Sequence, residues 1–236
     1  RDFVRIADVP AHVKNAILAA EDAGFYEHPG IEISGIARAA VINLLTGRRG
    51  QGGSTITMQV ARNFFLTTQR TYTRKLYEIA MSFKIEHELT KDRILEIYMN
   101  QIYLGQRSYG FASASRTYFG RPLDEISVGE AATIAGLPVA PSAYNPIVNP
   151  TRATMRRNYV LRRMLDLGYI DELTYQSEKS LPVQVRRAVE ETPLASSANA
   201  SADSVTAHYA AELARMLVFD IFGDETYSRG LNAVSY

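Results

Sequence analysis

The spacing of apolar residues from the start of the chain to about Gly168 predicts a series of helices. The first stripe places four residues at the i, i+3, i+4 and i+7 positions of one helix face: Val13, Ala16, Ile17 and Ala20. Pro10, just before the stripe, suits a first helical turn. Strand-like alternation is almost absent from this region, so the pattern predicts a mainly α fold.

Five more helices are predicted in the same way, each from an apolar stripe and most with a start or stop signal. The stripes and signals are Ala37, Ala40, Val41 and Leu44 between Ser34 and Gly47; Leu76, Ile79, Ala80 and Phe83; Ile94, Leu95, Tyr98 and Ile102 behind Thr90; Ala131, Ile134 and Ala135 behind a Ser127/Glu130 capping box; and Leu161, Met164 and Leu165 between Asn149-Pro150 and Gly168.

The composition changes in the last quarter of the chain. The tract from Glu190 to Ser204 is small and polar, and it cannot bury enough surface to fold alone. Helical spacing returns from Val205 to Phe222, and a strand-like end follows. We therefore predict a domain over residues 1–183, a flexible linker over 184–204, and a helix and strand over 205–236.

Composition and charge exclude several classes of protein and of functional site. The 26 basic and 25 acidic side chains nearly balance, so there is no bulk signature of nucleic-acid binding. The absence of cysteine excludes disulfides, thiolate metal sites and thiol nucleophiles. No run reaches the roughly 18 apolar residues that span a bilayer. The chain opens on Arg1 without a signal-like segment, so we expect a fragment of a longer protein, with any membrane anchor outside it.

The first candidate for chemistry is the pair Glu21-Asp22 at the end of the first predicted helix. Acidic residues at a helix C-terminus oppose the macrodipole, and Phe25, Tyr26 and His28 follow directly. A carboxylate beside apolar rings acquires a raised pKa, which suits a general base. A solvated helix end is the alternative, and the pair alone does not decide between them.

Two further segments carry candidate anion-binding groups. The glycines of Gly50 to Gly53 precede Ser54 and Thr55, and such a turn can present N–H groups and hydroxyls to an anion. The alternative is a flexible loop in which Ser54 caps the next helix; a nucleotide-binding loop is disfavoured because no Gly-Lys-Ser/Thr ending follows.

The second segment contains Arg74, Lys75 and Glu78, which have two interpretations. They can form an exposed ion pair worth ~0.5 kcal/mol or less. Alternatively, Glu78 is held among basic residues that bind a pyrophosphate. The basic residues are Arg62, Arg70, Arg74 and Lys75. Other site chemistries find no support, because the four histidines are scattered and no Ser-x-x-Lys or Gly-x-Ser-x-Gly element occurs.

Five motifs follow one another between residue 21 and residue 120. They are Glu21-Asp22-x-x-Phe25-x-x-His28-x-Gly30; Gly52-Gly53-Ser54-Thr55-Ile56-Thr57-x-Gln59; Arg74-Lys75-x-x-Glu78; Lys91 to Asn100 followed by Tyr103-Leu104-Gly105; and Gly110 to Ala114 with Tyr118-Phe119-Gly120. In this order they resemble the peptidoglycan glycosyltransferase domain (glycosyltransferase family 51) of class A penicillin-binding proteins. The resemblance covers residues 1 to about 175. Met58 departs from it, because many relatives carry glutamine there.

The resemblance implies a lysozyme-like helical fold and an inverting transfer that polymerises lipid II and releases undecaprenyl pyrophosphate. Glu21 would remove the proton from the acceptor 4-hydroxyl, a role that typically contributes ~10²–10⁴-fold to the rate. Glu78 would be the second catalytic residue, with Arg38 among the basic residues around the pyrophosphate. The expected substrate-binding residues are Asp22, Phe25, His28, Arg38, Gln51, Gly53, Ser54, Thr55, Gln59, Arg62, Arg70, Arg74, Lys75 and Asn100.

The resemblance also implies a setting. No cofactor is obligatory, and no metal ligands are assigned, but Mg²⁺ or Mn²⁺ beside Glu78 is a candidate. The expected partners are lipid II, the growing glycan chain, the membrane surface and other cell-wall synthesis proteins, with no nucleic acid. A transmembrane helix would precede the chain at the periplasmic face of the bacterial inner membrane, and a penicillin-sensitive transpeptidase domain would follow.

The segment Asn63 to Thr68 would face the membrane or, alternatively, end a core helix.

Two other functions stay open on the sequence alone. A lysozyme-like lytic enzyme or hydrolase would also need a carboxyl group with a raised pKa, but it has no pyrophosphate to hold beside Glu78. A non-enzymatic cell-wall scaffold needs neither carboxylate.

Overall fold

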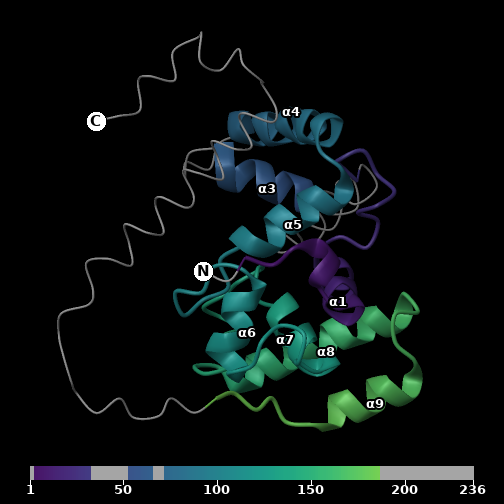
Figure 1. Ribbon diagram of the computed structural model, residues 1–236, viewed down its shortest axis with the longest axis vertical. Helices are drawn as coiled ribbons and strands as arrows, with labels where there is room; N and C mark the ends of the chain where they lie inside the picture. Colours follow the sequence, from purple (N-terminus) through teal and green to yellow (C-terminus); the bar gives the residue numbers. More distant parts are fainter. Residues whose placement is uncertain (1–2, 33–52, 66–71, 187–236) are drawn as a thin grey trace, which may run out of the picture. The chain divides into compact units, whose positions relative to one another are not determined.

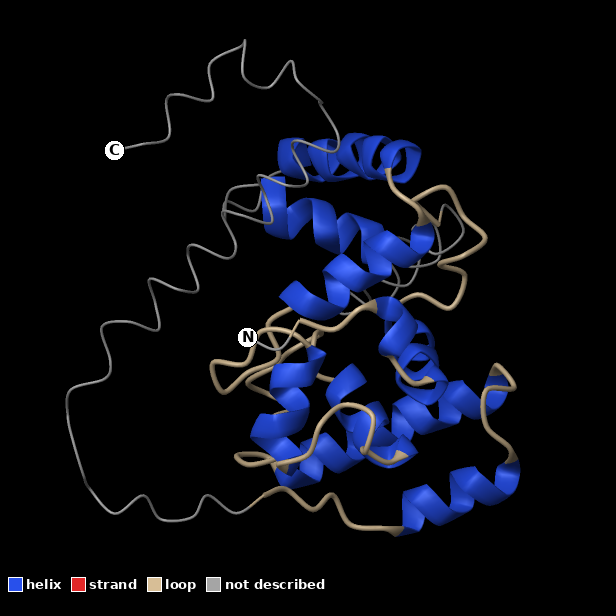
Figure 2. Cartoon of the chain, in the orientation of Figure 1, coloured by secondary structure: helices blue, strands red, loops and turns tan. Residues whose placement is uncertain are grey.

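The computed structural model of the protein describes residues 3–32, 53–65 and 72–186. Within these ranges there is no strand, and Tyr103 and Tyr109 form an isolated antiparallel bridge. The elements are η1 (Ile6–Asp8), α1 (Ala11–Glu21), α3 (Ile56–Phe65), α4 (Tyr72–Glu88), α5 (Lys91–Gln101), α6 (Phe111–Phe119), α7 (Val128–Ala135), α8 (Pro150–Asp166) and α9 (Glu172–Ser180), shown in Figure 1 and Figure 2. The prediction of a mainly α fold is confirmed.

Several helix ends lie where the sequence predicts them. Thr90 accepts a hydrogen bond from the backbone N–H of Arg93 at the start of α5. Ser127 and Glu130 form the reciprocal capping box of α7. Gly168, just beyond α8, has a φ of +72°, a left-handed conformation that glycine adopts without strain.

The helices pack in two groups that meet where α1 ends. In one group α1 lies against α7 and α8, with α9 on α8; in the other α3 lies against α4 and α5 (Figure 1). The predicted stripe of α1 supplies core residues, with Val13, Ala16 and Ile17 at most 1% exposed. The two groups are joined directly after α1, because the buried Asp22 accepts a hydrogen bond from the backbone N–H of Ile56 at the start of α3.

The predicted stripe of α4 is wrong. Leu76 is 68% exposed and Phe83 44% exposed, and Ala80 is exposed as well. The face that α4 buries carries Glu78, Ser82 and Ile85. Two basic side chains from the preceding turn neutralise Glu78, and Ser82 bonds within the helix, so this polar face can be buried without unpaired charge.

Helix α9 was not predicted, because it has no apolar stripe and buries only Tyr175. It is held by polar contacts instead. Asp171 caps its start by accepting from the N–H of Thr174, and the buried guanidinium of Arg157 donates to the carbonyls of Lys179 and Leu181 at its end. Helix α6 and the short η1 were also missed.

The remaining predictions about the fold fall outside the described residues. They are the helix between Ser34 and Gly47, the linker beyond residue 186, and the helix and strand over 205–236. In the described ranges, no helix has both the length and the apolar character that crossing a membrane requires.

Candidate functional site

Glu21 is the last residue of α1, as the apolar stripe predicts, and its carboxylate is tied to α3. Its Oε2 accepts a hydrogen bond of 2.8 Å from Nε2 of Gln59. The residue as a whole is half-buried, but Oε1 is fully buried and has no hydrogen-bond donor among the described residues. One oxygen is therefore held by Gln59, and the other is buried without a hydrogen-bond donor among the described residues.

Burial raises the pKa of Glu21 to about 7. The hydrogen bond from Gln59 and the charges of Arg156 and Arg62 act in the opposite direction, and the neighbouring charge of Asp22 adds to the increase. A carboxylate with a pKa near neutrality exists in both forms at working pH, which is the property that general acid–base catalysis requires.

Asp22 and His28 support the turn after α1 through hydrogen bonds with each other and with the backbone. Nε2 of His28 lies 2.9 and 3.0 Å from the two carboxylate oxygens of Asp22, and the N–H of Gly30 donates to Nδ1 over 3.1 Å. Burial raises the pKa of Asp22 despite these bonds.

Phe25 is fully buried, so its side chain packs inside the protein. Its ring meets Tyr26 and His28 edge to face, and Nζ of Lys91 lies 4.6 Å from its centroid. Tyr26 is 49% exposed and donates to Asp92. The raised pKa that the sequence predicts for Glu21 is present, and burial is its largest cause.

Tyr98 of α5 is an aromatic residue whose pKa is affected by the charge of Glu21. Its hydroxyl is buried without a hydrogen-bond partner among the described residues, and burial, together with the charge of Glu21, raises its pKa. The sequence placed Tyr98 on a core stripe but gave no signal of its proximity to a residue so far away along the chain.

Thr55 caps α3, whereas the loop alternative had assigned that role to Ser54. The hydroxyl of Thr55 donates to the carbonyl of Gly30 over 2.6 Å and accepts from the N–H of Met58 over 3.2 Å. Met58, the position that departs from the family pattern, is fully buried, so an apolar side chain is compatible with its place in the core.

Glu78 forms the second centre of charge, and it is buried rather than exposed. Its side chain is 1% exposed, with Nε of Arg74 at 3.2 Å and Nζ of Lys75 at 3.0 Å. The same Nζ donates to Oγ of Ser54 over 2.8 Å. The interpretation of Arg74, Lys75 and Glu78 as a solvated ion pair is therefore wrong. We call Ser54, Arg74, Lys75 and Glu78 the Glu78 cluster.

The described residues around Glu78 do not provide a protein ligand set for Mg²⁺ or Mn²⁺. Both oxygens of Glu78 already face cations, and no group of three or more His, Asp or Glu side chains that could hold a metal ion occurs within the described ranges.

Asn100 has a structural role that the sequence did not indicate. Its Oδ1 accepts from the N–H of Val4, and its Nδ2 donates to the carbonyls of Val4 and Glu96. These bonds hold the N-terminal segment on α5 and occupy both N–H groups of the amide.

The other expected site residues divide into two sets. Arg62 is half-buried on α3 and acts on Glu21 electrostatically, and Gly53 lies half-buried before α3. The remaining three, Arg38, Gln51 and Arg70, lie outside the described residues.

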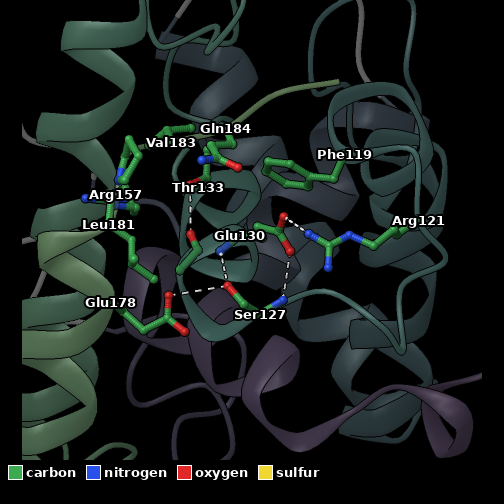
Figure 3. A pocket seen from close by; sticks show the side chains of 12 residues that line it. Phe119, Arg121, Ser127, Glu130, Thr133, Arg157, Glu178, Leu181, Val183 and Gln184 are labelled. Carbon is green, nitrogen blue, oxygen red and sulfur yellow. Dashed lines mark hydrogen bonds and ion pairs between the residues drawn. The ribbon is translucent and has the colours of Figure 1, made fainter. Parts of the chain in front are cut away.

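A pocket of about 240 Å³ lies elsewhere, between α7, α8, α9 and the segment 181–184 (Figure 3). None of the expected site residues lines it. Its polar groups are bonded within the protein: Arg121 pairs with Glu130, and the hydroxyl of Ser127 donates to Glu178 over 3.3 Å. The pocket is therefore not the candidate site.

Comparison with known proteins identifies the family to which the chain is similar. The family model described as "Transglycosylase" matches residues 1–165. The chain is 46% identical over 235 residues to penicillin-binding protein 1A of Pseudomonas aeruginosa, covering 100% of this chain and 27% of that protein. It is 45% identical over 230 residues to penicillin-binding protein 1A of Neisseria flavescens, covering 98% of this chain and 27% of the relative.

A solved structure agrees with the sequence comparisons. The crystal structure of penicillin-binding protein 1A from Haemophilus influenzae matches with a TM-score of 0.50 and 30% identity, over 96% of this chain and 22% of that chain. The chain thus spans about a quarter of the length of the proteins that it resembles, and its similarity is to the part of them that contains the transglycosylase domain.

Proposed function

The chain belongs to the transglycosylase family, and on that premise we propose that it is a peptidoglycan glycosyltransferase domain that polymerises lipid II into β-1,4 glycan strands. The observation that carries the proposal is the state of Glu21. A carboxylate with a pKa of about 7 and one oxygen held by Gln59 is prepared to take up a proton at neutral pH.

In the proposed reaction the ionised Glu21 removes the proton from the 4-hydroxyl of the acceptor sugar. The freed oxygen attacks the anomeric carbon of the donor, forming the new C–O bond. The bond from that carbon to the phosphate oxygen breaks, and the electron pair leaves with undecaprenyl pyrophosphate. Attack opposite to the leaving group inverts the configuration from α to β, and the proton stays on Glu21 until it passes to solvent.

The Glu78 cluster is the proposed site for the leaving pyrophosphate. Arg74 and Lys75 supply positive charge for phosphate oxygens, and the hydroxyl of Ser54 is bonded to the same ammonium group. Glu78 is 1% exposed, so its role is to orient the two cations rather than to contact the substrate. The family resemblance assigns Arg62, Arg38 and Arg70 to pyrophosphate binding as well.

This cluster favours the transferase over the lytic alternative. A hydrolase that acts on a glycan has no pyrophosphate to neutralise, so it has no use for two cations set around a buried carboxylate. The proposed setting is the periplasmic face of the bacterial inner membrane, with the growing glycan and other cell-wall synthesis proteins as partners. In the whole protein we propose that a penicillin-sensitive transpeptidase domain follows this one.

One experiment separates the candidate functions. The protein is incubated with labelled lipid II in detergent and, separately, with labelled preformed glycan, and the products are resolved by size. Long glycan strands support the proposal. Short fragments released from preformed glycan indicate a lytic enzyme, and unchanged lipid II together with unchanged glycan indicates a scaffold.

A further inference from the structure

Lys91 is the first residue of α5, and its ammonium group contacts both α4 and the turn that follows α1. Its Nζ donates to the carbonyl of His28 over 2.7 Å and to Oε1 of Glu86 over 2.8 Å. The same Nζ lies 4.6 Å from the ring centroid of Phe25. Only 21% of the Lys91 side chain and 10% of the Glu86 side chain are exposed. Because the pair is largely removed from solvent, its attraction is screened less than that of a surface ion pair.

The carboxylate of Glu86 also contacts α3. Its Oε1 accepts a second hydrogen bond from the hydroxyl of Thr57, which is fully buried. Thr57 lies on α3 two residues before Gln59, the residue that bonds Glu21. One oxygen atom on α4 thus joins the start of α3 to the start of α5. We call Thr57, Glu86 and Lys91 the Glu86 bridge.

The end of the turn packs closely against the same part of α4. A Cβ atom on Gly30 would lie 2.8 Å from Cγ of Glu86 and 3.1 Å from the carbonyl oxygen of Ser82, and the φ of Gly30 is +91°. Glycine allows this approach and this conformation without strain. Thr55 holds the turn from α3, because its hydroxyl donates to the carbonyl of Gly30. The turn is therefore fixed between α3 and α4, and a shift of either helix would displace it.

A chain of hydrogen bonds leads from Lys91 to the residue beside Glu21. Lys91 holds the carbonyl of His28. The ring of His28 bonds the carboxylate of Asp22 over 2.9 and 3.0 Å. Asp22 follows Glu21 directly and is the C-cap residue of α1. The Glu86 bridge therefore reaches the backbone of the proposed base through this chain, and its hydrogen-bond partner through α3.

We propose that Lys91 and Glu86 are positioning residues for glycosyl transfer: by joining the turn after α1 to the start of α3, they fix Glu21 and its partner Gln59 in the geometry that proton transfer requires. This inference rests on the proposed function of Glu21. A displacement of about 1 Å at a reacting group can cost on the order of 10²-fold in rate, so a bridge that prevents such a displacement affects the rate without contacting the substrate.

The alternative is that the Glu86 bridge only stabilises the fold. Both roles predict a lower melting temperature when Lys91 is replaced, so stability does not separate them. They differ in the variant that remains folded. A positioning role predicts a changed bond between Gln59 and Glu21 and a lower kcat, whereas a purely structural role predicts neither.

The first test is the side-chain amide signal of Gln59 in the chain labelled with ¹⁵N-glutamine, identified by its loss from Gln59→Leu. Lys91→Met keeps an unbranched apolar side chain and removes the ammonium group, and it should move this signal toward that of a solvent-exposed amide. Lys179→Met is the matched control, because Nζ of Lys179 also lies over a ring, 5.2 Å from the centroid of Tyr175, but on α9. It should leave the signal unchanged. An unmoved Gln59 signal in folded Lys91→Met would overturn the proposal.

Polymerisation of lipid II supplies the second test. In Lys91→Met, kcat should fall by about three- to tenfold with little change in KM, because the Glu78 cluster is left intact. Lys91→Arg, which restores a cation for Glu86, should recover part of the rate. In a Gln59→Leu background Lys91→Met should cost less, since the bond that it disturbs is already absent. Equal costs in the two backgrounds, or a loss confined to the melting temperature, would overturn the proposal.

Two outcomes need a separate readout. If Lys91→Met does not fold, Glu86→Gln takes its place, because it keeps the shape of the side chain and removes the charge that pairs with Lys91. It should move the Gln59 signal in the same direction by a smaller amount, and an unchanged signal would overturn the proposal. Should the wild type make no glycan, the proposed function fails, and the Gln59 signal still decides whether the Glu86 bridge positions this residue.

Discussion

Nε2 of Gln59 on α3 donates a 2.8 Å hydrogen bond to Oε2 of Glu21 at the end of α1. This bond joins the two groups of helices at the carboxylate itself. Because the amide donates, it favours the ionised form of Glu21 and offsets part of the effect of burial. The position of α3 relative to α1 therefore sets both the orientation and the protonation of the proposed base.

Gln59→Leu should shift the acid limb of the pH–rate profile upward. Without the donor, burial acts on Glu21 with less opposition, so a higher pH is needed to ionise it. At pH 7 the rate of lipid II polymerisation should fall several-fold, with partial recovery at pH 8.5. Gln176→Leu is the control, since it removes an exposed amide that also donates to a glutamate. A profile for Gln59→Leu that is lowered equally at every pH would contradict this account.

The raised pKa of Glu21 also predicts how stability depends on pH. The folded state binds the proton more tightly than the unfolded state, whose glutamate has a pKa near 4.5. Between that value and about 7 the folded state holds more protons, so this group's contribution to the free energy of unfolding falls as pH rises through the window.

Glu21→Gln should remove this dependence. Thermal melts should show the variant gaining stability over the wild type at pH 8, with little gain at pH 4.5. If the difference between the two melting temperatures is the same at both pH values, Glu21 does not have the raised pKa on which the proposed mechanism depends.

Glu78→Gln should impair both stability and polymerisation. Removing one partner of a buried ion pair leaves the other charges uncompensated, which costs about 3–5 kcal/mol when the pair is fully buried. The loss here should be smaller, because Lys75 is partly exposed and can be hydrated. Chemical denaturation measures the stability, and the lipid II assay measures the activity. Glu88→Gln, at the exposed end of the same helix, should change neither. Full activity of Glu78→Gln would show that the cluster does not serve the leaving group.

Substitutions at Phe25 test whether this motif residue acts through core packing or through contact with the substrate. Phe25→Leu keeps most of the apolar volume and should remain active with an unchanged KM for lipid II and a modestly lower melting temperature. Phe25→Ala should lose about 3–5 kcal/mol of stability, because it leaves a cavity in a fully buried site. A raised KM in a stably folded Phe25→Leu would instead show that the ring contacts the substrate.

The parts of the fold that local sequence determines were predictable. The start of α5 at Thr90 and the capping box at Ser127 depend on residues within one helical turn, and both occur as expected. The placement of Glu21 at the end of α1 follows from the apolar stripe that precedes it. In each case the interacting groups are neighbours along the chain, so the pattern contains the whole of the interaction.

The errors arise where partners are distant along the chain. The stripe of α4 was assigned to the wrong face because the burial of Glu78 depends on how α4 packs against α3, which helical periodicity does not describe. Tyr98 and Arg156 act on Glu21 from α5 and α8, and no spacing rule connects residues so far apart. The motif positions Phe25 and Asn100 were recognised as important, but only the structure shows that both are engaged with the protein itself.

The central claim is that Glu21 is the general base, and the rate of lipid II polymerisation by Glu21→Gln tests it most directly. The glutamine preserves the shape of the side chain and can still accept a hydrogen bond from Gln59, but it cannot take up the acceptor proton. We predict a folded variant whose rate falls by about 10²–10⁴-fold at pH 7.5. A rate within a few-fold of the wild type, from a variant with a wild-type circular dichroism spectrum, would contradict the account.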